Sequence, residues 1–144
     1  MIIALIGYGR MGHEIEEMAK RRGHTIKLII DINNQQDFVP ANLKEIDVAI
    51  EFSSPSAAFL NIVKCLEEGI PVVSGTTGWL GKYDRVIDIC KKKKTSFIHS
   101  SNFSLGVNLL FRLNKDLAKH MQRYSDYNAS IEEIHQEVLK ALEM

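Results

Sequence analysis

The sequence lacks an excess of charge of either sign. Lys and Arg together number 18, as do Asp and Glu, so the formal net charge is zero. A chain without a net field does not attract nucleic acid or an anionic membrane over a distance, and we expect neither as a partner. The four consecutive lysines at 91–94 are predicted to lie at a helix end and to face solvent rather than to bind nucleic acid.

Cysteines and long apolar runs are also scarce. Cys65 and Cys90 lack the Cys-x-x-Cys spacing of zinc and redox motifs, so we expect reduced structural thiols and no metal site. The apolar run Ile2–Ile6 breaks at Gly7, far short of the roughly 20 residues of a membrane span, and no basic leader precedes it. These absences predict a protein of the cytoplasm.

The hydrophobic pattern of the chain predicts its fold class. The 144 residues suffice for one hydrophobic core and are too few for two well-packed domains. Short β-branched runs alternate with segments of helical periodicity, which is typical of repeated β-α-β units. We therefore predict an α/β fold, a doubly wound parallel sheet in a single domain. The predicted strands cover residues 2–6, 25–30, 48–52, 72–74 and 96–99.

Glycine and proline positions delimit the predicted helices. A glycine follows each of the helices predicted over residues 11–22 and 55–68, and Ser54 is expected to cap the second one before Pro55. Residues 33–44 are polar and carry Pro40, so we predict a loop there in place of a crossover helix. A further helix is predicted over residues 105–124. We place the domain over residues 1–129, followed at 130–144 by a strand remnant (130–134) and a short helix (137–143).

A glycine-rich segment, Gly7-Tyr8-Gly9-Arg10-Met11-Gly12, joins the first predicted strand to the first predicted helix. In this context such a segment is typical of the Rossmann-type dinucleotide fold. Gly7 permits the tight turn, Gly9 lets backbone N–H groups approach a pyrophosphate, and Gly12 permits close helix packing. The phosphates then lie on the positive helix N-terminus. Arg10 is either a phosphate ligand or a solvated surface residue, and a plain strand-to-helix turn is the alternative for the whole motif.

An acidic residue ends the second predicted strand. Asp31 lies about 20 residues after the turn, where a carboxylate accepts hydrogen bonds from the adenosine ribose and repels a 2′-phosphate. Ile32, Asn33 and Asn34 supply no cation for such a phosphate. We therefore expect NAD(H) as the preferred cofactor, with NADP(H) as the second candidate. The alternative is that Asp31 is an ordinary turn residue at a strand end.

Four segments together resemble a known family. They are the glycine turn, Glu51-Phe52-Ser53, Gly75-Thr76-Thr77-Gly78, and Ser101-Asn102-Phe103-Ser104-Leu105-Gly106-Val107-Asn108. In order and spacing they are similar to the 4-hydroxy-tetrahydrodipicolinate reductases, or dihydrodipicolinate reductases, of the diaminopimelate route to lysine. The last three lie at carboxyl ends of strands, where open α/β sheets bind ligands. The resemblance implies an NAD(P)H-dependent oxidoreductase. Its implied cofactor-binding residues are Gly7, Gly9, Arg10, Met11, Gly12, Asp31, Phe52, Gly75, Thr77, Ser101, Asn102 and Phe103.

The resemblance weakens after residue 135. The family continues with a His-His pair, a lysine and Asp-Ala-Pro-Ser-Gly-Thr-Ala, whereas this chain has His135 followed by Gln136, with Leu139 where the lysine belongs. Lys140 is one position out of register and receives no role. By resemblance His135 is the candidate catalytic residue, a proton donor, with a structural histidine as the alternative. The missing residues would hold a dicarboxylate substrate in the full-length family.

Two functional hypotheses follow. The first is the cofactor-binding part of a reductase that transfers hydride from NAD(P)H to a cyclic imine dicarboxylate, inactive by itself. The second is a freestanding NAD(H)-binding or redox-sensing module without catalysis. The amino-terminal lobe of a homoserine or aspartate dehydrogenase would account for the glycines but not for the third and fourth segments together. Association into a homo-oligomer is left open.

Overall fold

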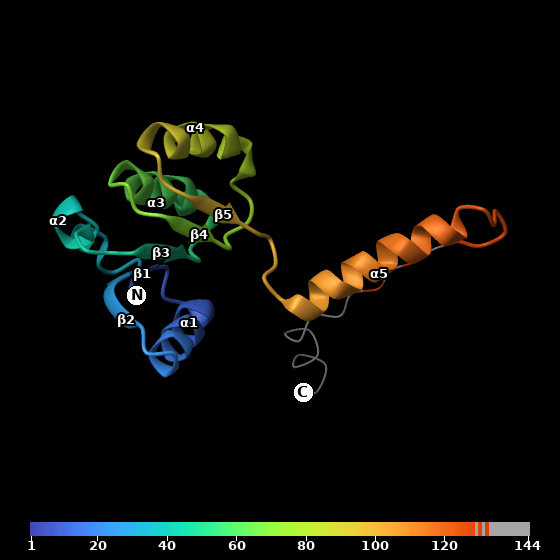
Figure 1. Cartoon of the computed structure of the whole chain (residues 1–144), viewed down its shortest axis with the longest axis horizontal. Helices are drawn as coiled ribbons and strands as arrows, with labels where there is room; N and C mark the ends of the chain where they lie inside the picture. Colours follow the sequence, from blue (N-terminus) through green and yellow to red (C-terminus); the bar gives the residue numbers. More distant parts are fainter. Residues whose placement is uncertain (129, 131, 133–144) are drawn as a thin grey trace. The chain divides into compact units, whose positions relative to one another are not determined.

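Five parallel strands form the sheet predicted from the sequence (Figure 1). The structure is a computed structural model, and it describes residues 1–128, 130 and 132. The strands are β1 (Ile2–Ile6), β2 (Thr25–Ile30), β3 (Val48–Glu51), β4 (Val72–Ser74) and β5 (Phe97–His99), and their order in the sheet is β2-β1-β3-β4-β5. The doubly wound α/β fold class is therefore confirmed.

The order of the strands creates a crevice at one edge of the sheet. β1 pairs with β2 on one side and with β3 on the other, so Ile6 is in register with both Ile30 and Glu51. The chain first winds outward to β2 and then crosses back to β3. Loops that leave β1 and β3 therefore diverge, and this is the point at which open α/β sheets bind ligands.

Helices cover both faces of this sheet (Figure 1). α1 (Arg10–Arg21) contacts β1 and β2 on one face, whereas α3 (Pro55–Glu67) contacts β3 and β4 on the other and packs against α4 (Tyr83–Lys93). The shorter segments are α2 (Pro40–Leu43) and the 3₁₀ helices η1 (Gln35–Asp37) and η2 (Leu80–Lys82). The crossover between β2 and β3 thus contains only these short segments, and its Phe38 and Leu43 are buried in the core.

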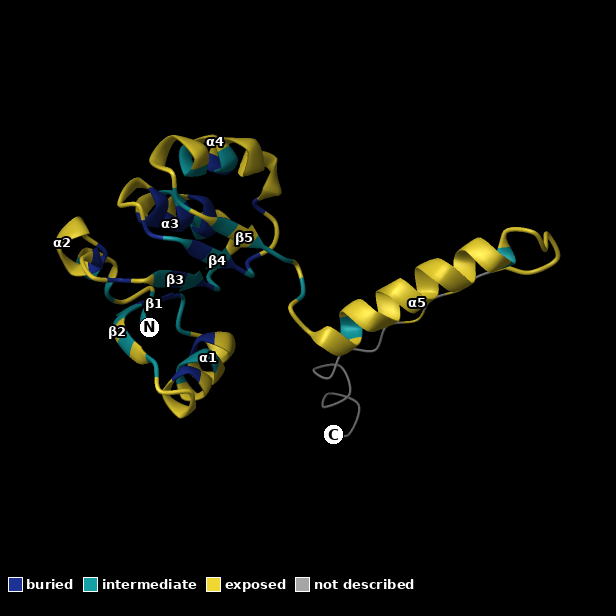
Figure 2. Cartoon of the chain, viewed as in Figure 1, coloured by how far each residue is buried: buried dark blue, intermediate teal, exposed yellow. Residues whose placement is uncertain are grey.

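The core consists of two layers, one on each face of β1 (Figure 2). Ile3 and Leu5 face α1, where they pack with Ala19, and the alternate residues Ala4 and Ile6 face α3. This alternation follows from the two-residue period of a strand. Full burial of a large aliphatic side chain stabilises the fold by about 1.5–3 kcal/mol. Both layers therefore fix β1, and with it the position of the loop that leaves its carboxyl end.

The structure corrects two details of the local prediction. The loop predicted over residues 33–44 is wrong in part, because η1 and α2 form within it. Pro40 begins α2 rather than preventing it, since a proline at the first helical position loses no hydrogen bond. Ser54 does precede α3, but its hydroxyl makes no cap; its oxygen lies 3.0 Å from the hydroxyl oxygen of Ser56.

The lysine run lies where the sequence predicts. Lys91, Lys92 and Lys93 form the last turn of α4, and all four lysines are exposed. Lys94 follows in a left-handed conformation with φ of 53°. Glycines with positive φ, Gly23 and Gly69, come shortly after α1 and α3, as predicted.

The chain divides into two compact units. The first, Met1–Phe103, contains the whole sheet, and the second begins at Ser104 and contains α5 (Leu105–Met121). The predicted boundary at residue 129 falls at a position that is not described, and it stays a prediction. Most of the predicted strand at 130–134 and all of the predicted helix at 137–143 lie outside the described residues. Within the described part, no helix is both long and apolar enough to cross a membrane.

Candidate functional site

The three glycines of the turn after β1 differ in what the fold requires of them. Gly7 has φ of +95°, and a Cβ there would lie 2.0 Å from the carbonyl oxygen of Phe52. A Cβ at Gly12 would lie 2.6 Å from the carbonyl oxygen of Gly7, so α1 packs directly on the turn. At Gly9, in contrast, a Cβ would meet no atom within 4 Å. Gly9 is therefore required neither for conformation nor for packing, and its missing side chain leaves open space at the start of α1.

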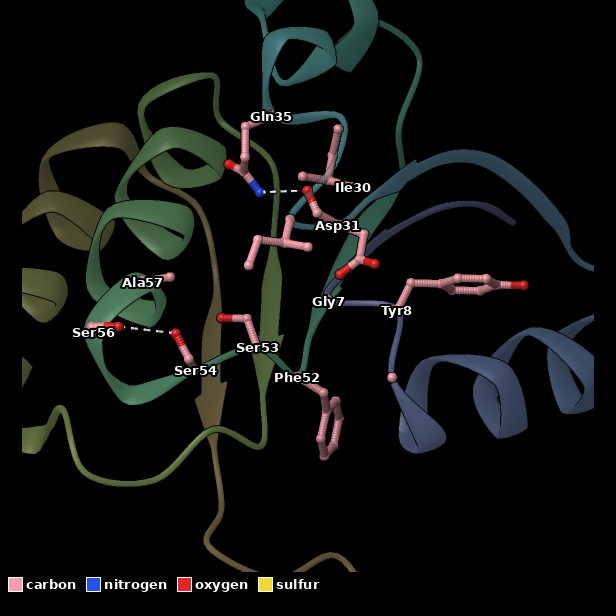
Figure 3. Close-up of a pocket in the computed structure, with 12 residues that line it drawn as sticks. Gly7, Tyr8, Ile30, Asp31, Gln35, Phe52, Ser53, Ser54, Ser56 and Ala57 are labelled. Atoms are coloured by element: carbon pink, nitrogen blue, oxygen red, sulfur yellow. Dashed lines mark hydrogen bonds between the residues drawn. The ribbon is translucent and has the colours of Figure 1, made fainter.

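Two hollows meet at Gly9. The first, of about 520 Å³, lies between the loops that leave β1, β2 and β3 (Figure 3). The second, of about 350 Å³, extends from the start of α1 to the loop after β4. Gly9, Phe52 and Ser53 border both hollows. Together the hollows form a groove along the carboxyl edge of the sheet, with the N-terminus of α1 at its middle.

Asp31 lies in the first hollow, and its backbone is fixed by neighbouring side chains (Figure 3). Its N–H donates to Asn34 Oδ1 at 2.6 Å, and its carbonyl accepts from Gln35 Nε2 at 2.8 Å. Within the described part of the chain, its carboxylate has no hydrogen-bond or ion-pair partner. The two hydrogen bonds therefore fix the backbone of Asp31, and its carboxylate remains available to a ligand.

Tyr8 forms one wall of the first hollow. Its ring stacks on His13 with the centroids 4.0 Å apart, and its hydroxyl donates a hydrogen bond to Glu16. That hydrogen bond raises the pKa of Tyr8. Hydrogen bonds from Lys20 and then from Tyr8 lower the pKa of Glu16. Tyr8 is thus a fixed neutral aromatic surface beside the glycine turn.

Residues 75–78 are named here the β4 loop, and residues 75–77 of this loop border the second hollow. Thr76 is buried, with its hydroxyl on Glu51 at 2.9 Å, and its carbonyl accepts from Trp79 Nε1 at 2.8 Å. His99 Nε2 lies 3.0 Å from the same carbonyl. Both the hydroxyl and the carbonyl of Thr76 are therefore occupied by contacts within the protein. Gly75 and Thr77 are the members of this loop that border the hollow and that the sequence proposes as ligand contacts.

Aromatic rings pack around Gly75. A Cβ there would lie 2.0 Å from the Phe52 ring, so the ring occupies the space that a side chain would take. Phe103 lies next to Phe52, with ring centroids 6.2 Å apart. Ser100 closes the turn after β5, because its hydroxyl donates to the carbonyl of Asn102 at 2.8 Å. Ser101 is exposed and Asn102 is half-buried.

Most of the predicted site residues lie together along the groove. Gly12 packs behind it rather than bordering it. The predicted residues that border one or both hollows are Gly7, Gly9, Arg10, Met11, Asp31, Phe52, Gly75 and Thr77. Ser101, Asn102 and Phe103 border neither hollow, although Phe103 contacts Phe52. His135 lies outside the described residues.

Two polar residues in or near this groove received no role of their own in the sequence interpretation, although Glu51 belongs to one of the four segments that carry the resemblance. Gln35 belongs to η1, which the sequence did not predict, and it contacts the carbonyl of Asp31. Glu51 is 1% exposed, and its carboxylate accepts hydrogen bonds from the hydroxyl groups of Ser53, Ser74 and Thr76. A charged residue at the end of an apolar strand is the signal that could have singled it out.

The sheet order, the glycine turn and the groove at the strand switch point define a Rossmann-type domain. The chain belongs to the dihydrodipicolinate reductase family, because the family model described as "Dihydrodipicolinate reductase, N-terminus" matches residues 1–103. This match covers the first compact unit.

Named relatives agree with this family. The 4-hydroxy-tetrahydrodipicolinate reductase of Christiangramia forsetii is 57% identical over 137 residues, which are 94% of this chain and 56% of that protein. The protein of the same name from Methanosarcina acetivorans is 31% identical over 136 residues, which are 93% of this chain and 49% of that protein. The chain spans about half the length of the curated relatives it matches.

Solved structures share the fold. A homoserine dehydrogenase from Archaeoglobus fulgidus is 14% identical with a TM-score of 0.55, over 69% of this chain and 42% of that one. The aspartate dehydrogenase of Thermotoga maritima is 16% identical with a TM-score of 0.53, over 76% of this chain and 49% of that one. At such low identities these likenesses concern the fold alone, whereas the sequence family is that of the reductases.

Proposed function

We propose that this chain is the cofactor-binding part of a 4-hydroxy-tetrahydrodipicolinate reductase and that its groove holds a nicotinamide dinucleotide. The observation that carries the proposal is the placement of Gly9. It lies at the N-terminus of α1, where the two hollows meet, and a Cβ there would project into open space. A pyrophosphate between two nucleoside halves fits this position, because helix N–H groups and the helix dipole favour an anion there.

Each half of the cofactor has a matching part of the groove. The first hollow would take the adenosine, with the ribose hydroxyls donating to the Asp31 carboxylate and Tyr8 forming one wall. The second hollow would take the nicotinamide, beside Gly75, Thr77 and the Phe52 ring. No side-chain cap occupies the first turn of α1, so its N–H groups face the pyrophosphate position. When bound, the reduced cofactor supplies a hydride.

The charges of the first hollow favour NADH over NADPH. Asp31 is acidic, and the described residues that line this hollow include no Lys or Arg. A 2′-phosphate would therefore meet a carboxylate and no cation, since NADP(H) sites pair that phosphate with an arginine. The preference is expected to be about tenfold, which corresponds to about 1.4 kcal/mol.

The substrate side of the reaction depends on residues outside the groove. We propose a cyclic imine dicarboxylate as hydride acceptor in the whole protein, because the relatives are named reductases of that substrate. In this chain Gln136 and Leu139 replace family residues that would hold it. His135 is proposed as a proton donor, but proton donation cannot replace a substrate site. We expect the chain alone to bind cofactor without turnover, which is also what a freestanding redox-sensing module would do.

Calorimetric titration of the purified chain with NADH and with NADPH tests the proposal. We expect one NADH site per chain and about tenfold weaker binding of NADPH. Absence of binding by either cofactor would overturn the proposed function. Equal binding of the two would leave the groove in place and remove Asp31 from its proposed role.

A further inference from the structure

We infer that Glu51 is a positioning residue for the nicotinamide end of the groove: its buried carboxylate holds the β4 loop against the loop that follows β3. This inference rests on the proposed function, because it assigns the second hollow to the nicotinamide. Glu51 borders neither hollow and would not touch the cofactor. It acts through the loops that do.

The Glu51 carboxylate joins the ends of two adjacent strands. Ser74, the last residue of β4, donates its hydroxyl to Oε2 at 2.6 Å, and Thr76 donates its hydroxyl to Oε1 at 2.9 Å. On the β3 side, Ser53 donates to Oε1 through its hydroxyl and through its N–H at 3.1 Å. The Ser53 N–H also lies 2.8 Å from the Thr76 hydroxyl oxygen. Both carboxylate oxygens are therefore used, and each loop is bound to the same group.

The cluster is built around a charged group although the strand itself is apolar. Glu51 is 1% exposed, and it follows Ala49 and Ile50 in β3. A buried carboxylate is costly unless donors surround it, and here hydroxyl and N–H donors do so. Asn61 on α3 extends the cluster, because its amide donates to the Ser53 hydroxyl at 3.1 Å. Neither sheet pairing nor helix packing requires a carboxylate here. The role that its contacts indicate is therefore to hold the two loops together.

The contacts across to β4 affect one end of the groove. Residues 75–77 border the second hollow and not the first. The Phe52 ring packs on Gly75, so a displaced β4 loop would also release that ring. The first hollow is instead formed by the loops after β1, β2 and β3. Of the three hydroxyl partners of Glu51, Ser53 also borders this hollow, but the Asn61 amide binds its hydroxyl independently. Loss of the Glu51 carboxylate should therefore weaken contacts with the nicotinamide much more than contacts with the ADP-ribose half.

The test compares NADH with ADP-ribose, which lacks the nicotinamide ring, on the whole chain and on Glu51→Gln. Glutamine keeps the size of the side chain but offers one acceptor oxygen, and its NH₂ group faces the donors. We expect about tenfold weaker binding of NADH, ADP-ribose binding within twofold of the parent, and a reduced change in NADH fluorescence on binding. The control is Glu67→Gln, which removes a half-exposed carboxylate that pairs with Lys93 at 2.7 Å, and it should change neither ligand's affinity.

Equal losses for NADH and ADP-ribose would overturn the inference, since a merely structural role affects both ligands. Unchanged NADH binding would overturn it as well. If Glu51→Gln does not fold, Ser74→Ala decides the question, because it removes one donor and keeps the carboxylate; it should weaken NADH about threefold more than ADP-ribose, and equal effects would refute the inference. Failure of the parent chain to bind NADH would instead refute the proposed function, and the inference with it.

Discussion

Substitution of single glycines in the turn after β1 should separate binding from folding. Gly9→Val adds three carbons where a Cβ meets no atom within 4 Å, so the folded chain can accommodate them. The cost to folding should be about 1 kcal/mol, the usual penalty for an unfavourable residue at a helix N-cap. The same carbons would occupy the pyrophosphate position. Loss of two hydrogen bonds to a charged group, at about 1.5–3 kcal/mol each, weakens binding about 100-fold or more.

Gly7→Val is the contrasting variant. Gly7 has φ of +95°, and its Cβ would lie 2.0 Å from the Phe52 carbonyl oxygen. The left-handed conformation costs about 1–2 kcal/mol for a residue with a Cβ, and overpacking costs about 1–3 kcal/mol more. The combined loss is a large part of the roughly 5–15 kcal/mol that stabilises a typical domain. Gly7→Val should therefore lower the stability of the chain as well as its cofactor binding.

Urea unfolding followed by circular dichroism, together with an NADH titration, measures both effects on each variant. We expect Gly9→Val to lose NADH binding while its unfolding midpoint falls by about 0.3–1 M urea, which is the shift that about 1 kcal/mol gives. Gly7→Val should unfold at clearly lower urea than Gly9→Val. Parent-like NADH binding by a folded Gly9→Val would refute the placement of the pyrophosphate. Equal destabilisation of the two variants would refute the distinction between an open and a closed glycine position.

Three further outcomes are expected. Asp31→Asn should raise NADPH affinity relative to NADH about tenfold, because the carboxylate that repels a 2′-phosphate is gone; an unchanged ratio in paired titrations would contradict this role. The chain given NADH and freshly generated 4-hydroxy-tetrahydrodipicolinate should show no NADH oxidation above background, and a rate comparable to that of a full-length relative would contradict the need for a separate substrate site. Burial, followed by the Glu51 charge, raises the pKa of Cys65 to about 12, so about one thiol in ten thousand is ionised at pH 8. An aromatic disulfide reagent should therefore modify Cys65 only after unfolding, and rapid reaction in the folded chain would argue against this burial.

Sequence patterns were sufficient for the strands and for the glycine turn. Each strand is a short run rich in apolar residues, and the positive φ of Gly7 is a local requirement, so both appear in the order of residues along the chain. The same applies to Asp31, whose position at the end of β2 follows from the length of one β-α-β unit. The match of the family model to residues 1–103 agrees with the resemblance inferred from these segments.

The Glu51 cluster could not be predicted in the same way. Its members, Ser53, Ser74 and Thr76, lie at the ends of two different strands, and they meet because β3 pairs with β4. The missed turn of α2 has a local cause instead. Pro40 was interpreted as a helix breaker, yet at the first helical position it favours a helix.

The most direct test of the central claim is an NMR titration of the ¹⁵N-labelled chain with NADH. If the groove binds NADH, the amide shifts should concentrate at residues 9–12, at Asp31, at Ser53 and at residues 75–77, which lie along the groove or directly behind it. Amides at the opposite edge of the sheet, such as Gly69 after α3 and the lysines at 91–94, should not move. Shifts centred on those amides, or saturation without any change at Gly9, would contradict the claim that this groove holds the cofactor.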